Sequence, residues 1–312
     1  MPPSPWPTAL GLAGGIGLDA LLGDPRRGHP VAAFGTVAAA AERAVHCDSR
    51  AVGTAYAGAL ALLAAGAGLG LTRAARTPLQ RAVVTAAATW AVVGGTSLRR
   101  EAAAMRGLLE AGDLDGARSR LSHLCGRDPA TLDEAGLARA TVDSVAENTS
   151  DAVVGPLFWG AVGGVPGLLA YRAVNTLDAM VGHRSARYAR FGWAAARLDD
   201  LANLVPARLT AALAVALAPV VGGRPRVVLR VWRRDGRKHP SPNAGPVEAA
   251  FAGALGRTLG GPLRYGTQPP EERPLLGNGP APDVADIGRA ARLSAAVSVA
   301  AGGLAVAVRT LH

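Results

Sequence analysis

The stretch AVGTAYAGALALLAAGAGLGLT, Ala51–Thr72, runs for 22 residues without a charged side chain. A helix that rises about 1.5 Å per residue needs roughly 20 such residues to cross a hydrocarbon core of about 30 Å. Alanine, glycine and leucine make up most of the stretch, and small side chains allow membrane helices to pack closely together. The stretch therefore predicts a transmembrane helix.

Similar apolar stretches recur and predict an all-α, polytopic membrane protein with about five transmembrane helices, between four and six. The other candidates are Ala82–Leu98, Ala152–Tyr171, Leu209–Gly223, Leu293–Val308 and Thr8–Gly23. Thr8–Gly23 contains Asp19, whose carboxylate costs about 2.5–3.5 kcal/mol at the centre of a lipid-exposed helix. That cost favours packing of Thr8–Gly23 inside the protein.

Residues 1–312 are expected to form one membrane domain with three polar regions. Residues 99–151 have the spacing of polar helices, and residues 172–203 form a polar amphipathic segment. Residues 224–292 begin with a basic helix and continue into a Pro/Gly-rich loop. These polar regions, rather than the apolar spans, are expected to carry an active site.

The composition supports a membrane location over a nucleic-acid partner. Charged residues make up 18% of the 312 residues, below the roughly 25% of an ordinary soluble domain. The net charge is +10, but the arginines flank apolar segments, as in membrane proteins, and no RNA-binding pattern accompanies them. We therefore expect no nucleic-acid partner.

Three acids recur at helical spacing near the end of the first polar region. Asp143, Glu147 and Asp151 fall at i, i+4 and i+8, on one face if the segment is helical. Stacked carboxylates repel one another, and a hard cation such as Mg²⁺ relieves that repulsion. The alternative is a solvated helix face with an N-cap at Ser150 or Asp151.

A second group of acids and amides precedes the Leu209–Gly223 span. The group comprises Asn175, Asp178, Asp199, Asp200 and Asn203. Uncompensated charge next to a span is costly, so the group indicates either a metal–phosphate site or a buried ion pair between an aspartate and an arginine.

Two proline-containing turns also carry polar side chains. Asp24 and His29 each precede a proline, which is typical of a turn that ends a helix but also fixes two ionisable groups. Lys238, Ser241 and Asn243 lie in a proline-rigidified loop and offer a charge, a hydroxyl and an amide suited to phosphate. No P-loop motif is present.

Several of these runs together resemble one family. They are Leu22–Pro25 with His29-Pro30, Ser144–Asn148 with Ser150-Asp151, Asn175–Asp178 with Met180–Gly182, Phe191–Trp193, Arg197–Asn203, Pro206–Thr210, Ser241–Gly245 and Glu248–Pro262. In this order, from about Leu18 to Gly277, the chain is similar to the CobD/CbiB family of adenosylcobinamide-phosphate synthases. Two positions depart from the family pattern: Pro240 replaces a basic residue, and Pro246 replaces an aromatic residue.

The resemblance implies a multi-pass protein of the cytoplasmic membrane that acts in cobalamin (vitamin B12) biosynthesis. Such a protein joins adenosylcobyric acid to (R)-1-amino-2-propanol or its phosphate through an amide bond, giving adenosylcobinamide or its phosphate. Because a free carboxylate is a poor electrophile, the resemblance also implies ATP and Mg²⁺, with phosphorylation of the corrinoid carboxylate before the amine attacks. The lipid bilayer and other late cobalamin-pathway membrane proteins are the expected partners.

Residue chemistry at the matching positions suggests three sets of roles. The expected Mg²⁺ ligands are Glu147, Asp151, Asp199 and Asp200. The groups expected to hold substrate or phosphate are Asp24, Asn148, Asn175, Asn203, Arg208, Lys238, Ser241 and Asn243. The expected catalytic groups are Arg197, which would hold a phosphate, and Asp178 or His29, which would accept the proton of the attacking ammonium.

Two alternatives remain at this point. An intramembrane prenyltransferase would use aspartate-rich helices to bind Mg²⁺-diphosphate but would leave the Ser241 loop unexplained. A non-catalytic transporter or scaffold would not need so many acids and amides. Simple span counting also places residues 172–203 opposite the other polar regions, which requires Ala152–Tyr171 to be broken or re-entrant, or residues 175–203 to fold into the membrane.

Overall fold

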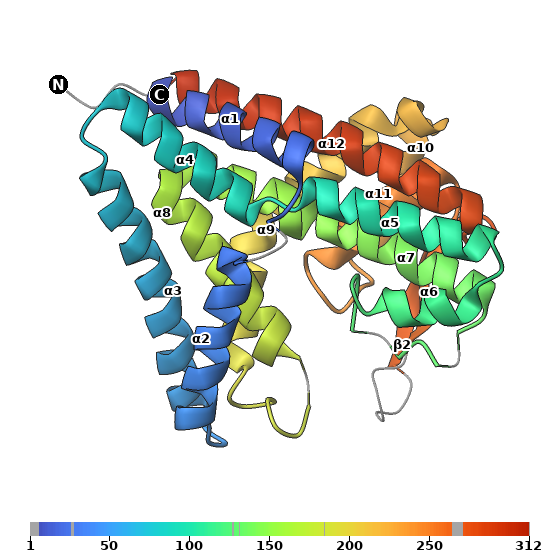
Figure 1. Cartoon of the computed structure of the whole chain (residues 1–312). Coiled ribbons are helices and arrows are strands. Elements are labelled where there is room, and N and C mark those ends of the chain that lie inside the picture. Colours follow the sequence, from blue (N-terminus) through green and yellow to red (C-terminus); the bar gives the residue numbers. More distant parts are fainter. Residues whose placement is uncertain are drawn as a thin grey trace. The chain divides into compact units, whose positions relative to one another are not determined.

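The computed structural model describes residues 6–25, 28–126, 128–130, 132–183, 185–263 and 271–311. Within these ranges nearly all regular structure is helical (Figure 1). The elements are α1 (Trp6–Leu22), α2 (Pro30–Val45), α3 (Arg50–Ala74), α4 (Pro78–Val92), α5 (Gly95–Glu110), α6 (Leu114–Leu121), α7 (Glu134–Thr149), η1 (Ser150–Val154), α8 (Gly155–Leu177), η2 (Asp178–Gly182), α9 (Trp193–Leu217), η3 (Ala218–Val221), α10 (Pro225–Asp235), α11 (Ala244–Leu255), β1 (Thr258–Leu263), β2 (Glu271–Gly277) and α12 (Val284–Leu311).

Among the described residues, four helical stretches are long and apolar enough to cross a membrane. They are Arg50–Ala74, Glu134–Gly182, Trp193–Val221 and Val284–Leu311. The prediction of a polytopic, all-α membrane protein is therefore confirmed, with a number of spans at the low end of the expected range.

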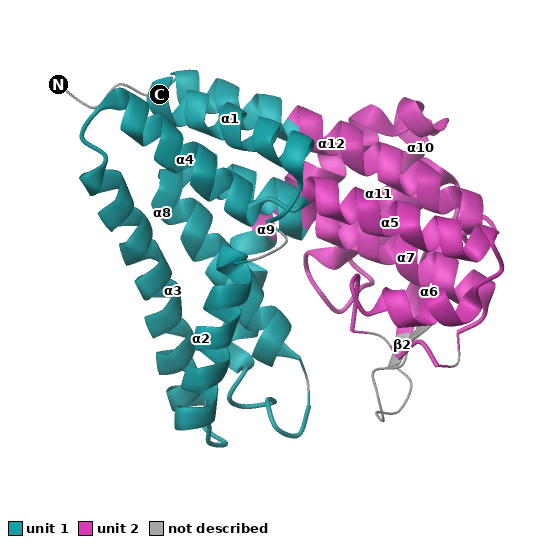
Figure 2. Ribbon diagram, in the orientation of Figure 1, with its two compact units in different colours: residues 1–94, 151–203, 301–312 teal, residues 95–150, 204–300 magenta. Residues whose placement is uncertain are grey.

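The chain divides into two compact units, coloured separately in Figure 2. Unit 1 contains residues 1–94, 151–203 and 301–312, and unit 2 contains residues 95–150 and 204–300. Each unit is assembled from segments that are far apart in the sequence. Whether they act as the single membrane domain expected from the sequence stays a prediction.

The apolar stretch Ala82–Leu98 is not one helix, contrary to the prediction. Helix α4 ends at Val92, and α5 begins at Gly95. Val93 between them is extended, and the Gly94 N–H donates to the carbonyl of Ala152 at 3.0 Å. A hydrophobic run thus contains a break that hydropathy alone cannot reveal, because Gly94 makes its hydrogen bond with a distant segment instead of continuing the helix.

Helix α1 packs beside α4 within unit 1, as Figure 1 shows. Gly11 and Gly15 of α1 face Thr85 and Thr89 of α4 so closely that a Cβ atom at either glycine would overlap a threonine side chain. Small residues let membrane helices approach in this way. Asp19 is buried in α1, which agrees with packing of this helix inside the protein.

Helix α8 is kinked in its middle. Gly164 has φ 61° and ψ −146°, and Pro166 follows inside the helix. The kink makes room for α3, because Gly68 of α3 lies against the backbone of Pro166. Ala152–Tyr171 is therefore kinked within the candidate span Glu134–Gly182, and the side of the membrane on which residues 172–203 lie stays a prediction.

In unit 2, the expected Pro/Gly-rich loop is largely folded, which corrects the sequence interpretation. The basic helix α10 is present, but α11 and the antiparallel hairpin of β1 and β2 follow it. Every residue of α11 is buried. Pro246 lies in the first turn of α11, where a proline is tolerated because its missing N–H has no partner within the helix.

Candidate functional site

Helix α8 and the first part of α9, both in unit 1, bring an acid and two amides together. The Asp199 carboxylate accepts hydrogen bonds from Asn175 Nδ2 at 3.3 Å and from Asn203 Nδ2 at 3.0 Å. Asn203 is 1% exposed, so its amide is fixed inside the protein. The structure therefore joins three of the predicted site residues, from two segments of the chain, in one hydrogen-bonded network.

Tyr171 extends this network and was not predicted from the sequence. Its hydroxyl lies 2.8 Å from Asn203 Oδ1 and 3.1 Å from the carbonyl oxygen of Asp151, and the residue is 2% exposed. A Cβ atom at Gly155 would overlap the tyrosine ring, so the ring position depends on that glycine. Trp159 Nε1 also donates to the carbonyl of Ala202 at 2.9 Å and holds α8 against α9.

Arg172 places a cation beside the same network, and it too was missed. Its Nη1 donates to Asn175 Oδ1 at 3.3 Å, and the carboxylates of Asp24 and Asp151 attract its guanidinium. The Nε atom is buried and has no hydrogen-bond partner among the described residues. The sequence offered one indication that Arg172 belongs to the site: it stands at the end of a long apolar run, where a charge is costly unless it is paired.

The turn between α1 and α2 brings Asp24 to this region of unit 1. Trp90 Nε1 donates to the Gly23 carbonyl at 2.8 Å and fixes the turn. His29 Nε2 lies 3.9 Å from Asp24 Oδ2, and His29 Nδ1 accepts the N–H of Val31 at 3.2 Å. The turn follows the end of α1 at Leu22, as the turn interpretation expected, and His29 also caps the start of α2 and faces a carboxylate.

Two π-helical turns flank α8, and each contains a predicted site residue. Asp151 lies in η1, and Asp178 lies in η2. Single π-helical turns inside α-helices are rare and are frequently found at functional sites. Asp200 is held differently, because it pairs with the exposed Arg197 at 3.1 Å.

Glu147 and Asn148 lie in α7 of unit 2. Asn148 Nδ2 donates to the Ser144 carbonyl at 2.9 Å. Asp143, one turn before Glu147, is 0% exposed, so the alternative of a fully solvated acidic face is wrong. No three His, Cys, Asp or Glu side chains of the described residues form a group that could hold a metal ion.

The Ser241 loop of unit 2 is held by its own side chains. Ser241 Oγ accepts the N–H groups of Asn243 and Ala244 at 3.3 and 3.2 Å, at the start of α11. Arg208 donates to Asn243 Oδ1 at 3.1 Å and to the Pro242 carbonyl at 3.2 Å. The structure therefore brings together three of the four residues expected to hold phosphate here.

Lys238, the fourth, pairs with the buried Asp235 at 2.7 Å. Asp235 also accepts the N–H of Gly277 and hydrogen bonds from Arg234. These contacts lower the pKa of the Asp235 carboxyl below its usual 3.8, mainly through Arg234 and against the opposing effect of burial. Asp235 thus ties α10 to the end of β2.

The buried His239 and Glu248 form a cluster with the half-buried Arg273 behind the loop, and the sequence did not reveal this cluster. His239 Nδ1 accepts the N–H of Ser241 at 3.0 Å. Its Nε2 lies 3.2 Å from Arg273 Nη1 and 3.9 Å from Glu248 Oε1. The cluster joins α11 to β2, so no local sequence pattern could have predicted it.

Comparison with known proteins identifies the family. The family model described as CobD/Cbib protein matches residues 12–294. The chain belongs to the CobD/CbiB family. Its relatives include proteins named cobalamin biosynthesis protein CobD in Mycobacterium tuberculosis (54% identical over 97% of this chain and 96% of the relative), Chromobacterium violaceum (47%, covering 92% of each) and Rhodobacter capsulatus (44%, covering 88% of each). No solved structure matches the chain.

CobD/CbiB membership confirms the resemblance drawn from the sequence. The match includes Asp24, the network of α8 and α9, and the Ser241 loop. The roles of the individual side chains stay predictions.

Proposed function

We propose that this CobD/CbiB family member catalyses amide-bond formation in cobalamin biosynthesis, between adenosylcobyric acid and (R)-1-amino-2-propanol or its phosphate. The relatives' shared name, cobalamin biosynthesis protein, supports the pathway. The observation that carries the site is the Asn175–Asp199–Asn203–Tyr171 network, because such a buried polar network inside apolar helices is costly and is typical of a functional site.

The network's proposed task is to position the corrinoid carboxylate and the amine. Holding two reactants in the correct geometry can lower the activation free energy by about 7–11 kcal/mol. Asn175 would orient the carboxylate, while Arg172 would offset its charge. Asn203 would keep Asp199 in place by donating to its carboxylate, and Tyr171 would hold Asn203 by donating to its amide oxygen.

Asp178 is the better candidate for accepting the proton of the attacking ammonium. A neutral imidazole has one acceptor nitrogen. The Val31 N–H already donates to Nδ1 of His29, so the His29 proton belongs on Nε2, which faces Asp24. We therefore assign His29 the task of orienting Asp24 and leave proton acceptance to Asp178.

The acids of unit 1 are compatible with Mg²⁺. This ion usually keeps several waters and uses one or two protein carboxylates together with substrate phosphates, so a group of three acids is not required. Asp199 and Asp151 would hold it in unit 1, with Asp200 nearby in sequence, and Glu147 is the candidate in unit 2. Mg²⁺-ATP would supply the activation that a free carboxylate needs.

The loop of unit 2 is the proposed phosphate-holding element. Arg208 and Asn243 are hydrogen-bonded to each other, and Ser241 orders the start of α11. Lys238 is the weakest of the four candidates because its ammonium group already pairs with Asp235. The phosphate could belong to ATP or to aminopropanol phosphate.

The proposal places the enzyme in the cytoplasmic membrane and is tested by product formation. Purified protein in nanodiscs receives adenosylcobyric acid, Mg²⁺-ATP and aminopropanol, with or without its phosphate, and the amide is detected by mass spectrometry. Product should require every component. Absence of amide with all components present would contradict the proposal, and prenyl transfer or substrate uptake by the same preparation would support one of the two alternatives.

A further inference from the structure

The surface of α10 is strongly basic and lies directly after a membrane span. The span Trp193–Val221 ends at η3, and Gly222 with φ 80° closes it. Pro225 then begins α10 after a turn of only three residues. Gly223 in this turn packs against the backbone of Ala254 in α11, so the turn is fixed within unit 2.

The end of the span also lies next to the start of another span in the same unit. Arg289 of α12 donates to the carbonyl of Val221 at 2.9 Å. Arg289 pairs with Asp286, which also pairs with Arg257 at 2.6 Å. The C-terminal end of one span and the N-terminal end of the other therefore share a charged boundary, and α10 begins at that boundary.

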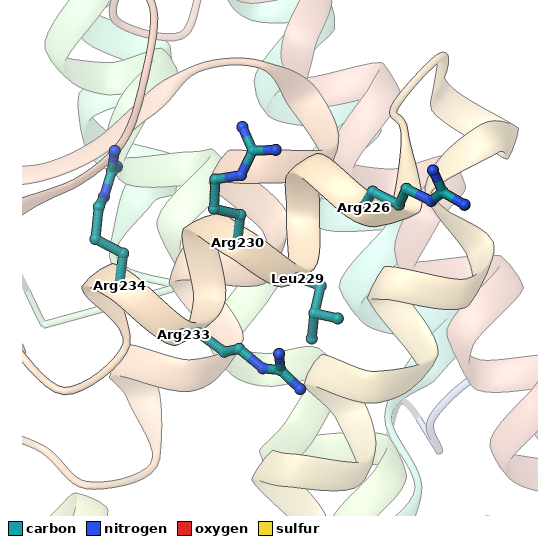
Figure 3. A pocket seen from close by; sticks show the side chains of 5 residues that line it. All are labelled: Arg226, Leu229, Arg230, Arg233 and Arg234. Atoms are coloured by element: carbon teal, nitrogen blue, oxygen red, sulfur yellow. The ribbon is translucent and has the colours of Figure 1, made fainter.

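One face of α10 is buried, and the opposite face carries arginines. Val228 and Val231 are buried toward the protein, as is Asp235. Figure 3 shows the outer side, a pocket of about 510 Å³ that is lined by Arg226, Leu229, Arg230, Arg233 and Arg234. Arg226, Arg230 and Arg233 are exposed, and the part of the chain that the structure describes supplies no acidic partner for them.

A bilayer surface fits this face better than a small anion does. Every residue that lines the pocket comes from α10, so a small ligand would be contacted from one side only. A membrane surface needs only one side, and a basic amphipathic helix with apolar residues among its cations is the usual interfacial form. Val227 is exposed and Leu229 is half-buried beside the arginines, which supplies that apolar component.

We propose that α10 lies on the membrane surface at the end of the Trp193–Val221 span and binds anionic phospholipid headgroups through Arg226, Arg230 and Arg233. Each basic residue near an anionic surface contributes about fivefold to association, so three contribute on the order of a hundredfold. Salt should weaken the interaction because it screens exposed charges.

The test uses the full chain in nanodiscs, with a fluorescent probe on the α10 surface. Cys47 and Cys125 are replaced by serine, and Leu229→Cys receives an environment-sensitive fluorophore. Quenching by headgroup spin-labelled lipid is compared in pure phosphatidylcholine and in phosphatidylcholine containing phosphatidylglycerol. Phosphatidylglycerol should increase quenching in the parent, and added salt should reverse the increase.

Three variants make the outcome decisive. The triple variant R226Q/R230Q/R233Q should lose the increase, and R226K/R230K/R233K should retain it because the charges remain. The control R106Q/R118Q/R190Q also removes three positive charges, but from arginines outside α10 that pair with Glu110, Asp115 and Asp48. Its quenching should increase with phosphatidylglycerol as that of the parent does.

Two results would overturn the proposal. One is equal quenching with and without phosphatidylglycerol in the parent. The other is displacement by inorganic phosphate beyond the effect of sodium chloride at matched ionic strength, which would identify a site for free anions instead of a lipid surface.

Discussion

The substitution Asp199→Asn separates the chemical role of the α8–α9 network from its structural role. Asp199 accepts one hydrogen bond from Asn175 and one from Asn203. An asparagine at position 199 has a single side-chain oxygen, so one of these two donors loses its acceptor. An unsatisfied buried donor costs roughly 1–3 kcal/mol, and hydrogen bonds between membrane helices average about 0.6 kcal/mol. We therefore expect a loss of about 1–2 kcal/mol, which leaves the protein folded.

The effect on catalysis should be much larger. If Asp199 acts through its charge, neutralising that charge should lower the rate of amide formation by about a hundredfold or more. Removal of one group that stabilises a transition state electrostatically has an effect of this size in other active sites. The double variant D199N/N203D provides the matched control. In it, Asn175 can donate to the new asparagine, and the new aspartate can accept from that asparagine and from Tyr171.

The double variant should recover stability without recovering activity, because it restores the hydrogen bonds but moves the charge by one helical turn. Thermal unfolding in detergent and the initial rate of amide formation measure the two quantities on the same preparation. Full activity of D199N would refute a role for the Asp199 charge. Recovery of both quantities in the double variant would make the network purely structural.

Three further predictions concern other parts of the chain. Asp235→Asn should destabilise the protein by roughly 1–3 kcal/mol at neutral pH, because it removes the charge of a buried carboxylate that accepts hydrogen bonds from the exposed Arg234 and Lys238. Because the pKa of Asp235 is depressed in the folded state, its charge should contribute fully to the free energy of unfolding above about pH 4, and this contribution should disappear as the pH falls further. Unfolding of the parent and of the variant, measured across this pH range, gives the difference. Gly245→Ala should lower the free energy of unfolding by about 1–3 kcal/mol, because the new Cβ would collide with a backbone carbonyl. The control Gly107→Ala has open space around its Cβ and should be neutral or stabilising. Equal effects of the two substitutions would contradict the described packing. A cysteine at Ser185, between two spans, should react with membrane-impermeant reagents from the side opposite to one at Arg224, and labelling of both from one side would exclude the four-span arrangement.

Much of the fold follows from composition and periodicity, but breaks within apolar runs do not. The long uncharged run near Ala51–Thr72 is a single helix, as predicted. Ala82–Leu98 has similar hydropathy but breaks at Gly94, because the Ala152 carbonyl accepts its N–H. Helix α11 was predicted as a loop because Pro246 and its glycines outweighed its apolar character, although the structure buries it completely.

The candidate site was predictable where its residues are polar and lie in recognisable runs. Asn175, Asp199 and Asn203 were singled out for their chemistry, and the structure brings them together. Tyr171 and Arg172 were missed because they stand at the end of an apolar run, where a sequence gives no direction for a side chain. Only the pairing of α8 with α9 shows that Tyr171 points to Asn203.

The most direct test of the proposed reaction uses adenosylcobyric acid labelled with ¹⁸O in its reacting carboxylate. Nanodisc-embedded protein, Mg²⁺-ATP and aminopropanol phosphate are mixed, and the amide and the released phosphate are analysed by mass spectrometry. Phosphorylation of the carboxylate by ATP predicts that amide formation is accompanied by phosphate that carries ¹⁸O from the corrinoid. Amide formed with only unlabelled phosphate would contradict the acyl-phosphate step, and no amide at all in the complete mixture would contradict an amide synthase.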